Sequence, residues 1–267
     1  MPFKPIGERH AIQEVVFIIG FARDFTPDEV ECVVANHSLW KSDLPKLERM
    51  NVFQIAFGDQ PPDHEPPPVV GPAVFKSFKR DGSLDWQLQV RDSWLAVNCL
   101  SYSRWDAVSR QAKSLLEKVL GLVIDESNLL SHISLQYIDT FVWDGDAEEY
   151  DIDLLVNRNS GFYADGFRPA SKSWHYHQGE FEFPDAEPTH RILKRVHLDA
   201  TEDEAGANIK IDTVLRTDFK NGVLPTIEGV RDLVDRTLNN LHAKNKTILA
   251  TLINQDAQDK ISLNREA

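Results

Sequence analysis

The sequence predicts an α+β protein with two similar halves, residues 1–125 and 126–267, each an antiparallel β-meander covered by a C-terminal amphipathic helix. Three observations support this. Strand-like runs joined by tight turns come in groups of three, each group is followed by a helical stripe, and this order occurs twice. A doubly wound fold would need alternating strands and helices. The 267 residues suffice for two such halves or for one fused domain.

The first half begins with an apolar strand and a capped helix. Residues 15–21 form an unbroken β-branched and aromatic run, which is typical of a strand covered on both faces. Thr26 is placed to cap a following helix, and Pro27 suits its first turn. Residues 51–57 alternate as a strand does, and the proline-rich residues 59–72 predict an irregular connection.

The first meander comprises predicted strands at 73–79, 84–91 and 94–100. The pair Asp81-Gly82 tolerates the positive φ of a tight hairpin between the first two. An amphipathic helix follows, and we expect its apolar stripe to be buried on the meander. The stripe consists of Trp105, Val108, Ala112, Leu115, Leu116, Val119 and Leu120.

The second half repeats this order of elements. A long strand is predicted at 129–143, followed by an acidic loop. Three more strands are predicted at 173–183, 191–198 and 208–217, with a hairpin bend at 201–206. The pattern of strand, loop, meander and helix therefore recurs.

The chain ends in a long predicted helix with an apolar residue at every seventh position, Ile227, Val234, Leu241 and Ile248. This stripe is longer than one helix needs to cover a three-stranded sheet. Its C-terminal part needs another surface, either the other half of the chain or a second copy. We expect a homodimer, because sevenfold spacing favours helix-on-helix packing. The residues expected in that contact are Ile248, Leu249, Leu252 and Ile253.

Charge restricts the classes of partner. The chain has 29 Lys and Arg against 42 Asp and Glu, a formal net charge of −13. Such a chain repels nucleic-acid backbones and anionic membranes, so we expect neither as a partner. Either the charge serves solubility alone or it attracts a basic protein partner. In the second case the candidate binding residues are Asp144, Asp146, Glu148, Glu149, Glu202, Asp203 and Glu204.

The two cysteines, Cys32 and Cys99, predict a reducing compartment. Neither has a Cys or His at metal-ligand spacing, and two thiols make no disulfide framework. The apolar run at 15–22 is too short to span a bilayer. We therefore expect a cytoplasmic protein.

Motifs for catalysis are absent from the sequence. It contains no phosphate-binding glycine loop, no GxSxG and no HExxH, so we expect no cofactor and no catalytic residue. His175 and His177 share one face of a predicted strand and could ligate one metal ion. The alternative is that these histidines simply face solvent on an antiparallel sheet, and we expect no metal site.

Three stretches resemble a sporadically distributed family of uncharacterised bacterial proteins of about this length. They are residues 100–106 (LSYSRWD), 132–139 (HISLQYID) and 238–242 (LNNLH). The middle stretch is similar to the family motif RIGLRYIN, and its departures from that motif include Gln136 and Asp139, where the family has Arg and Asn. The resemblance implies a bacterial or phage-associated cytoplasmic protein with the patchy occurrence of defence or toxin-related genes.

Taken together, the sequence predicts a non-enzymatic protein-interaction protein. It would act as an antitoxin or immunity protein, a phage-defence-associated protein or a chaperone-like binder of a basic partner. The alternative is a metal-assisted hydrolase that uses His175 and His177.

Overall fold

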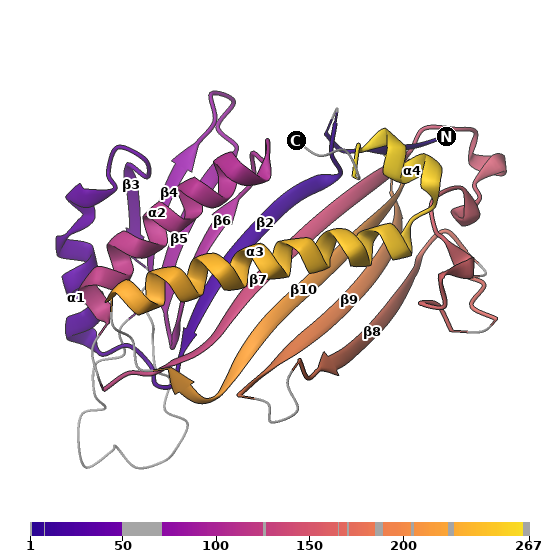
Figure 1. Ribbon diagram of the computed structural model, residues 1–267. Helices are drawn as coiled ribbons and strands as arrows, with labels where there is room; N and C mark the ends of the chain where they lie inside the picture. The colour runs from indigo at the N-terminus through magenta and orange to yellow at the C-terminus, as the bar shows by residue number, and fades with distance from the viewer. Residues whose placement is uncertain are drawn as a thin grey trace, which may run out of the picture. The chain divides into compact units, whose positions relative to one another are not determined.

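The chain folds into an α+β protein with a large antiparallel sheet (Figure 1). The structure, a computed structural model, describes residues 2–7, 9–49, 71–124, 127–164, 166–169, 171–184, 189–203, 206–223 and 227–263. The strand predicted at 51–57 and most of the predicted proline-rich connection lie outside these residues. No helix in the described part of the chain is long and apolar enough to cross a membrane.

The described strands are hydrogen-bonded in the order β3-β4-β5-β6-β2-β7-β10-β9-β8, and β1 also pairs with β7. The pairs β1–β7, β3–β4, β4–β5, β5–β6, β8–β9 and β9–β10 are antiparallel. The strands are β1 (Phe3–Pro5), β2 (Ile12–Phe21), β3 (Lys46–Arg49), β4 (Ala73–Phe78), β5 (Leu84–Arg91), β6 (Trp94–Cys99), β7 (Leu130–Trp143), β8 (Trp174–Glu182), β9 (His190–Asp203) and β10 (Gly206–Val223). The helices are α1 (Pro27–Ala35), α2 (Trp105–Val123), α3 (Ile227–Leu252) and α4 (Gln255–Lys260), and the short 3-10 turns are η1 (His37–Leu39), η2 (Ala147–Glu149), η3 (Ile152–Leu154) and η4 (Arg158–Ser160).

The chain divides into two compact units. Unit 1 contains Met1–Val16, Ile133–Lys220 and Asp235–Ala267, and unit 2 contains Phe17–His132 and Asn221–Val234. These two units do not contain the same residues as the predicted halves, 1–125 and 126–267. Those halves concern a repeated order of elements and remain a prediction.

In unit 2, the cap predicted for α1 is present. The backbone N–H of Glu29 donates to the Thr26 hydroxyl at 3.2 Å, and the Thr26 N–H donates to the Glu29 carboxylate at 2.6 Å. This reciprocal capping box satisfies two backbone donors, and Pro27 begins the helix where no donor is needed. The local sequence therefore fixes where α1 starts.

The meander of unit 2 consists of β4, β5 and β6 and closes as predicted. Gly82 has φ +85°, the left-handed conformation that the hairpin between β4 and β5 requires. Helix α2 packs against β6 and alongside α1 (Figure 1). The predicted stripe is buried except for Trp105, which is partly exposed, and Leu115 and Leu116 are 1% and 0% exposed. Two short elements, β1 and β3, were not predicted.

In unit 1, β8, β9 and β10 form a second meander. Thr201 pairs with Asn208 and Phe219 with His190, so β9 and β10 form a long hairpin that extends beyond the predicted bounds. One face of this hairpin supplies core residues such as Leu198 and Ile209, both 0% exposed.

The C-terminal part of α3 belongs to this same core. Leu249, Leu252 and Ile253 are 3%, 0% and 0% exposed within unit 1, and Ile248 packs against them. Of the four residues expected in a homodimer contact, Leu249, Leu252 and Ile253 are therefore covered by the chain itself, and Ile248 is partly exposed. A homodimer stays a prediction. The stripe can be long because α3 packs against a large core, so its length does not require a second copy of the chain.

Candidate functional site

Two acidic segments that lie apart in the sequence meet at one end of unit 1. The first follows β7 and continues through η2. The second is the tip of the β9–β10 hairpin, where Asp203 pairs with Gly206. A Cβ on Gly206 would lie 3.9 Å from the backbone oxygen of Trp143, the last residue of β7. The two segments therefore lie beside each other, and we call the surface that they form the acidic surface.

The acidic surface presents seven exposed carboxylate side chains. They are Asp144, Asp146, Glu148, Glu149, Asp151, Glu202 and Asp203. Six of the seven predicted partner-binding residues are thus brought to one place. The remaining one, Glu204, lies outside the described residues.

The charge of this surface is only partly compensated. Lys4 forms an ion pair with Asp144, and Lys172 Nζ lies 2.9 Å from Glu202 Oε1. In the described part of the chain, Asp146, Glu148 and Glu149 have no ion-pair partner. These three carboxylates consequently remain available to a cation from outside the chain.

Aromatic rings lie directly behind the acidic surface. The ring of Tyr150 packs edge-on against Trp143 at 5.3 Å and against Phe3 at 5.7 Å between ring centroids. The Trp143 indole N–H donates to the backbone oxygen of Asp146 at 3.1 Å. The loop that carries the acids is therefore fixed to a rigid aromatic base.

Tyr150 lies in an unusual polar environment. Burial raises the pKa of its phenol, and the carboxylates of Glu202 and Asp151 raise this pKa further, whereas the Trp174 indole N–H acts in the opposite direction. Trp174 lowers this pKa as a hydrogen-bond donor to the phenol would, although the Tyr150 hydroxyl and Trp174 Nε1 do not meet strict hydrogen-bond geometry with any described residue.

A second polar cluster is buried between β7 and α3 in unit 1. The Tyr137 hydroxyl lies 2.8 Å from Nδ1 of His242, within hydrogen-bond distance. Both residues belong to the stretches that resemble the bacterial family.

Asp139 follows Tyr137 on the same face of β7 and is 1% exposed. Burial raises its pKa to about 7. Neither carboxylate oxygen has a hydrogen-bond partner in the described structure, and the same holds for Thr213 Oγ1 and Asn245 Oδ1. Thr213 and Asn245 were not predicted, since single polar residues on apolar faces of β10 and α3 leave no motif. Gln136 points to the opposite face, where its amide donates to Asp212 at 2.8 Å.

A third histidine, His197, lies beside the predicted pair His175 and His177. His177 pairs directly with His197 across β8 and β9, and their ring centroids are 5.9 Å apart. The ring of His175 lies 6.1 Å from that of His197. However, no group of three His, Cys, Asp or Glu side chains in the described residues has an arrangement that could hold a metal ion.

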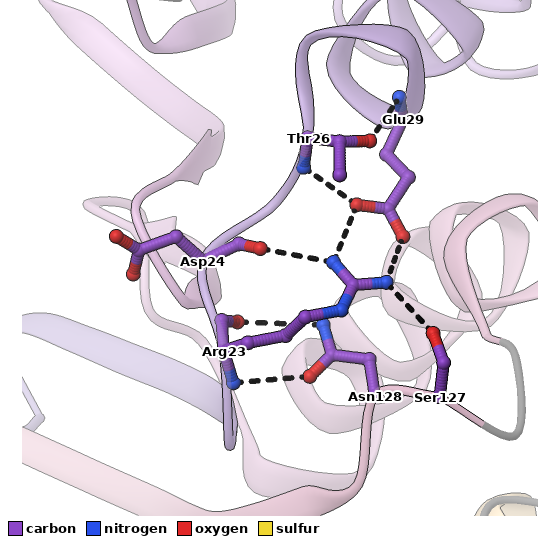
Figure 2. Close-up of polar contacts among 6 residues, drawn as sticks. All are labelled: Arg23, Asp24, Thr26, Glu29, Ser127 and Asn128. Atoms are coloured by element: carbon purple, nitrogen blue, oxygen red, sulfur yellow. Dashed lines mark hydrogen bonds and ion pairs between the residues drawn. The ribbon is translucent and has the colours of Figure 1, made fainter.

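A third polar network, around Arg23 in unit 2, is structural (Figure 2). Its guanidinium donates to both carboxylate oxygens of Glu29 at 2.9 and 2.8 Å and to the Ser127 hydroxyl at 3.1 Å. The Arg23 backbone N–H donates to Asn128, which donates back to the Arg23 carbonyl. The Arg23 hydrogen bonds are the main cause of the lowered pKa of Glu29. This network fastens the start of α1 to the segment before β7.

Comparison with known proteins gives one partial likeness. The chain is 33% identical over 91 residues to 6-oxocyclohex-1-ene-1-carbonyl-CoA hydrolase from Syntrophus aciditrophicus (strain SB). The aligned part is 34% of this chain and 21% of that protein, so the chain spans about a fifth of the length of this curated relative. No family model and no solved structure matches the chain. The likeness covers too little of either protein to show a family.

Proposed function

We propose that this chain is a non-enzymatic interaction protein that binds a basic protein partner on its acidic surface. One observation carries the proposal: two acidic segments from separate parts of the sequence meet at one end of unit 1. Three of the carboxylates there, those of Asp146, Glu148 and Glu149, have no ion-pair partner in the described residues. Such an arrangement attracts a cationic surface and orients it on approach.

The whole chain reinforces this local field. A net charge of −13 increases the rate of encounter with a basic partner and disfavours acidic ones. Within a bacterial cell, this activity fits an antitoxin or immunity protein, a phage-defence component or a chaperone-like binder. We place the protein in the cytoplasm, a location supported by its two cysteines, Cys32 and Cys99, which are not joined in a disulfide.

The second candidate function is a metal-assisted hydrolase that uses His175 and His177. The observation in its favour is that His197 adds a third imidazole on the same face of the sheet. Imidazole nitrogens are common ligands of zinc. This candidate ranks second because these rings are not arranged around a common centre among the described residues.

We further infer that the two halves, 1–125 and 126–267, are similar. In the first half β4, β5 and β6 are followed by α2, and in the second half β8, β9 and β10 are followed by α3. The order of the strands in the sheet supports the same inference. Each meander ends beside a strand from earlier in the same half, β6 beside β2 and β10 beside β7, although the first half has the additional strand β3 before its meander.

The proposed function is tested by removing charge from the acidic surface. The variant Asp146→Asn, Glu148→Gln, Glu149→Gln removes three carboxylates that lack an ion-pair partner. A fluorescein-labelled decapeptide of alternating lysine and glycine serves as the probe, and binding is followed by fluorescence anisotropy at low salt. We expect about tenfold weaker binding, since three exposed charge contacts contribute roughly 0.2–1 kcal/mol each. The difference should shrink at high salt.

A matched control removes the same charge elsewhere. The variant Asp24→Asn, Asp106→Asn, Asp256→Asn neutralises three exposed acids outside the acidic surface. Both variants have the same net charge, so an effect of charge alone would be equal in the two. We expect less than about a twofold change for the control. Equal losses in both variants, or no binding by the unmodified chain, would refute the proposed function.

A further inference from the structure

One cation of the chain itself is seated in the acidic surface. Lys172 lies in the irregular segment between η4 and β8, and its side chain is only 24% exposed. Its ammonium lies 2.9 Å from Glu202 Oε1 and 5.7 Å from the ring centroid of Tyr150. A carboxylate and an aromatic face together bind an ammonium group through an ion pair and a cation–π contact.

The other groups of this site are fixed before any ligand arrives. The Tyr150 ring is held by Trp143 and Phe3, as described above. Glu202 lies on β9, where the backbone of Glu202 pairs with that of Ala207 on β10. The aromatic face and the carboxylate therefore stand on rigid elements, whereas Lys172 lies on a segment outside the strands and helices.

We propose that the place occupied by Lys172 is a lysine-binding site for the basic partner, and that Lys172 fills it only in the unbound chain. This inference rests on the proposed function, and it names one side chain that the partner supplies. A lysine of the partner takes the position between Tyr150 and Glu202, and the Lys172 side chain moves into solvent. Lys172 thus lowers the affinity of the acidic surface for weak ligands.

The test is the variant Lys172→Met, titrated with the same lysine–glycine decapeptide. Removal of the internal competitor should tighten binding about fivefold, which corresponds to an exposed ion pair with a cation–π contact. Lys4→Met is the matched control. It removes a cation from the same acidic surface, where Lys4 pairs with Asp144, but it leaves Tyr150 and Glu202 unchanged. For the control we expect a gain of less than about twofold.

Two double variants test whether the gain in affinity depends on Glu202 and Tyr150. Adding Glu202→Gln or Tyr150→Leu to Lys172→Met should abolish the gain, because each removes one wall of the site. Thermal unfolding checks that Tyr150→Leu remains folded, and Glu202→Gln alters an exposed carboxylate only. Equal gains for Lys172→Met and Lys4→Met, or no gain for Lys172→Met, would overturn the lysine site.

The two proposals fail separately. If the Asp146, Glu148, Glu149 variant loses binding while Lys172→Met behaves as Lys4→Met does, the acidic surface binds cations without a lysine site. If that triple variant binds as its own control does, the proposed function fails, and this inference fails with it.

Discussion

The buried carboxyl of Asp139 makes the stability of the fold depend on pH. Its pKa is about 7 in the folded chain, because burial disfavours the charged form, against about 3.9 in an unfolded chain. Below pH 4 the group is protonated in both states and has no effect. As the pH rises from 4 to 7 the unfolded chain ionises first, so the free energy of unfolding falls. Above pH 7 the loss is constant.

The size of this effect follows from the difference in pKa. Three pKa units correspond to about 4 kcal/mol at 1.36 kcal/mol per unit. Asp139→Asn has nearly the same volume and cannot ionise. We therefore expect it to unfold with a similar free energy at pH 4 and with a free energy higher by up to about 4 kcal/mol at pH 8. Carboxyls with lowered pKa values, such as those of Glu29 and Glu182, act in the opposite direction, but they are common to both proteins and cancel in the difference.

The assay is urea unfolding of both proteins at several pH values between 4 and 8.5, followed by tryptophan fluorescence. The control is Asp146→Asn, which replaces an exposed carboxylate by the same isosteric change. A difference between wild type and Asp139→Asn that stays constant across this range would refute the reasoning. It would mean that the Asp139 carboxyl has water or another partner that restores an ordinary pKa.

Two further predictions concern unit 2. Leu115→Ala should lower the free energy of unfolding by about 2–5 kcal/mol, because Leu115 is on the buried face of α2 and only 1% exposed, whereas Leu39→Ala, at a side chain 50% exposed, should cost far less. A loss below about 1 kcal/mol for Leu115→Ala would show that this stripe is not core. Gly20→Ala should destabilise the fold by about 1–3 kcal/mol in chemical denaturation, because its Cβ would overlap the imidazole of His132. Adding His132→Ala should recover part of that loss, and no recovery would contradict the steric explanation.

Local signals in the sequence predicted the local structure of this chain. The capping box at Thr26, the Asp81-Gly82 hairpin and the α2 stripe each depend on residues within a few positions of one another. Strands β1 and β3 have only 3 and 4 residues, too few to show a period, and so they were missed.

Properties that depend on distant pairing could not be predicted. Whether the hairpin tip at Asp203 reaches the end of β7 depends on the register of strands that share no local signal. The apolar stripe ending at Leu252 and Ile253 predicted burial correctly, but a stripe does not specify which surface covers it. The buried acceptors of Thr213 and Asn245 were invisible for a similar reason, since their isolation is a property of the packed core.

The division into units has a consequence for synthesis on the ribosome. The chain passes between the units four times, and each passage falls inside a continuous element, in β2, β7, β10 and α3. Unit 2 needs residues up to Val234, and unit 1 needs the segment from Asp235 onward. Unit 2 therefore cannot be completed until Val234 has left the ribosomal tunnel, and unit 1 cannot be completed until the segment after Asp235 has followed. Until then apolar strands of the nascent protein remain uncovered, and chaperones can act on them during this period.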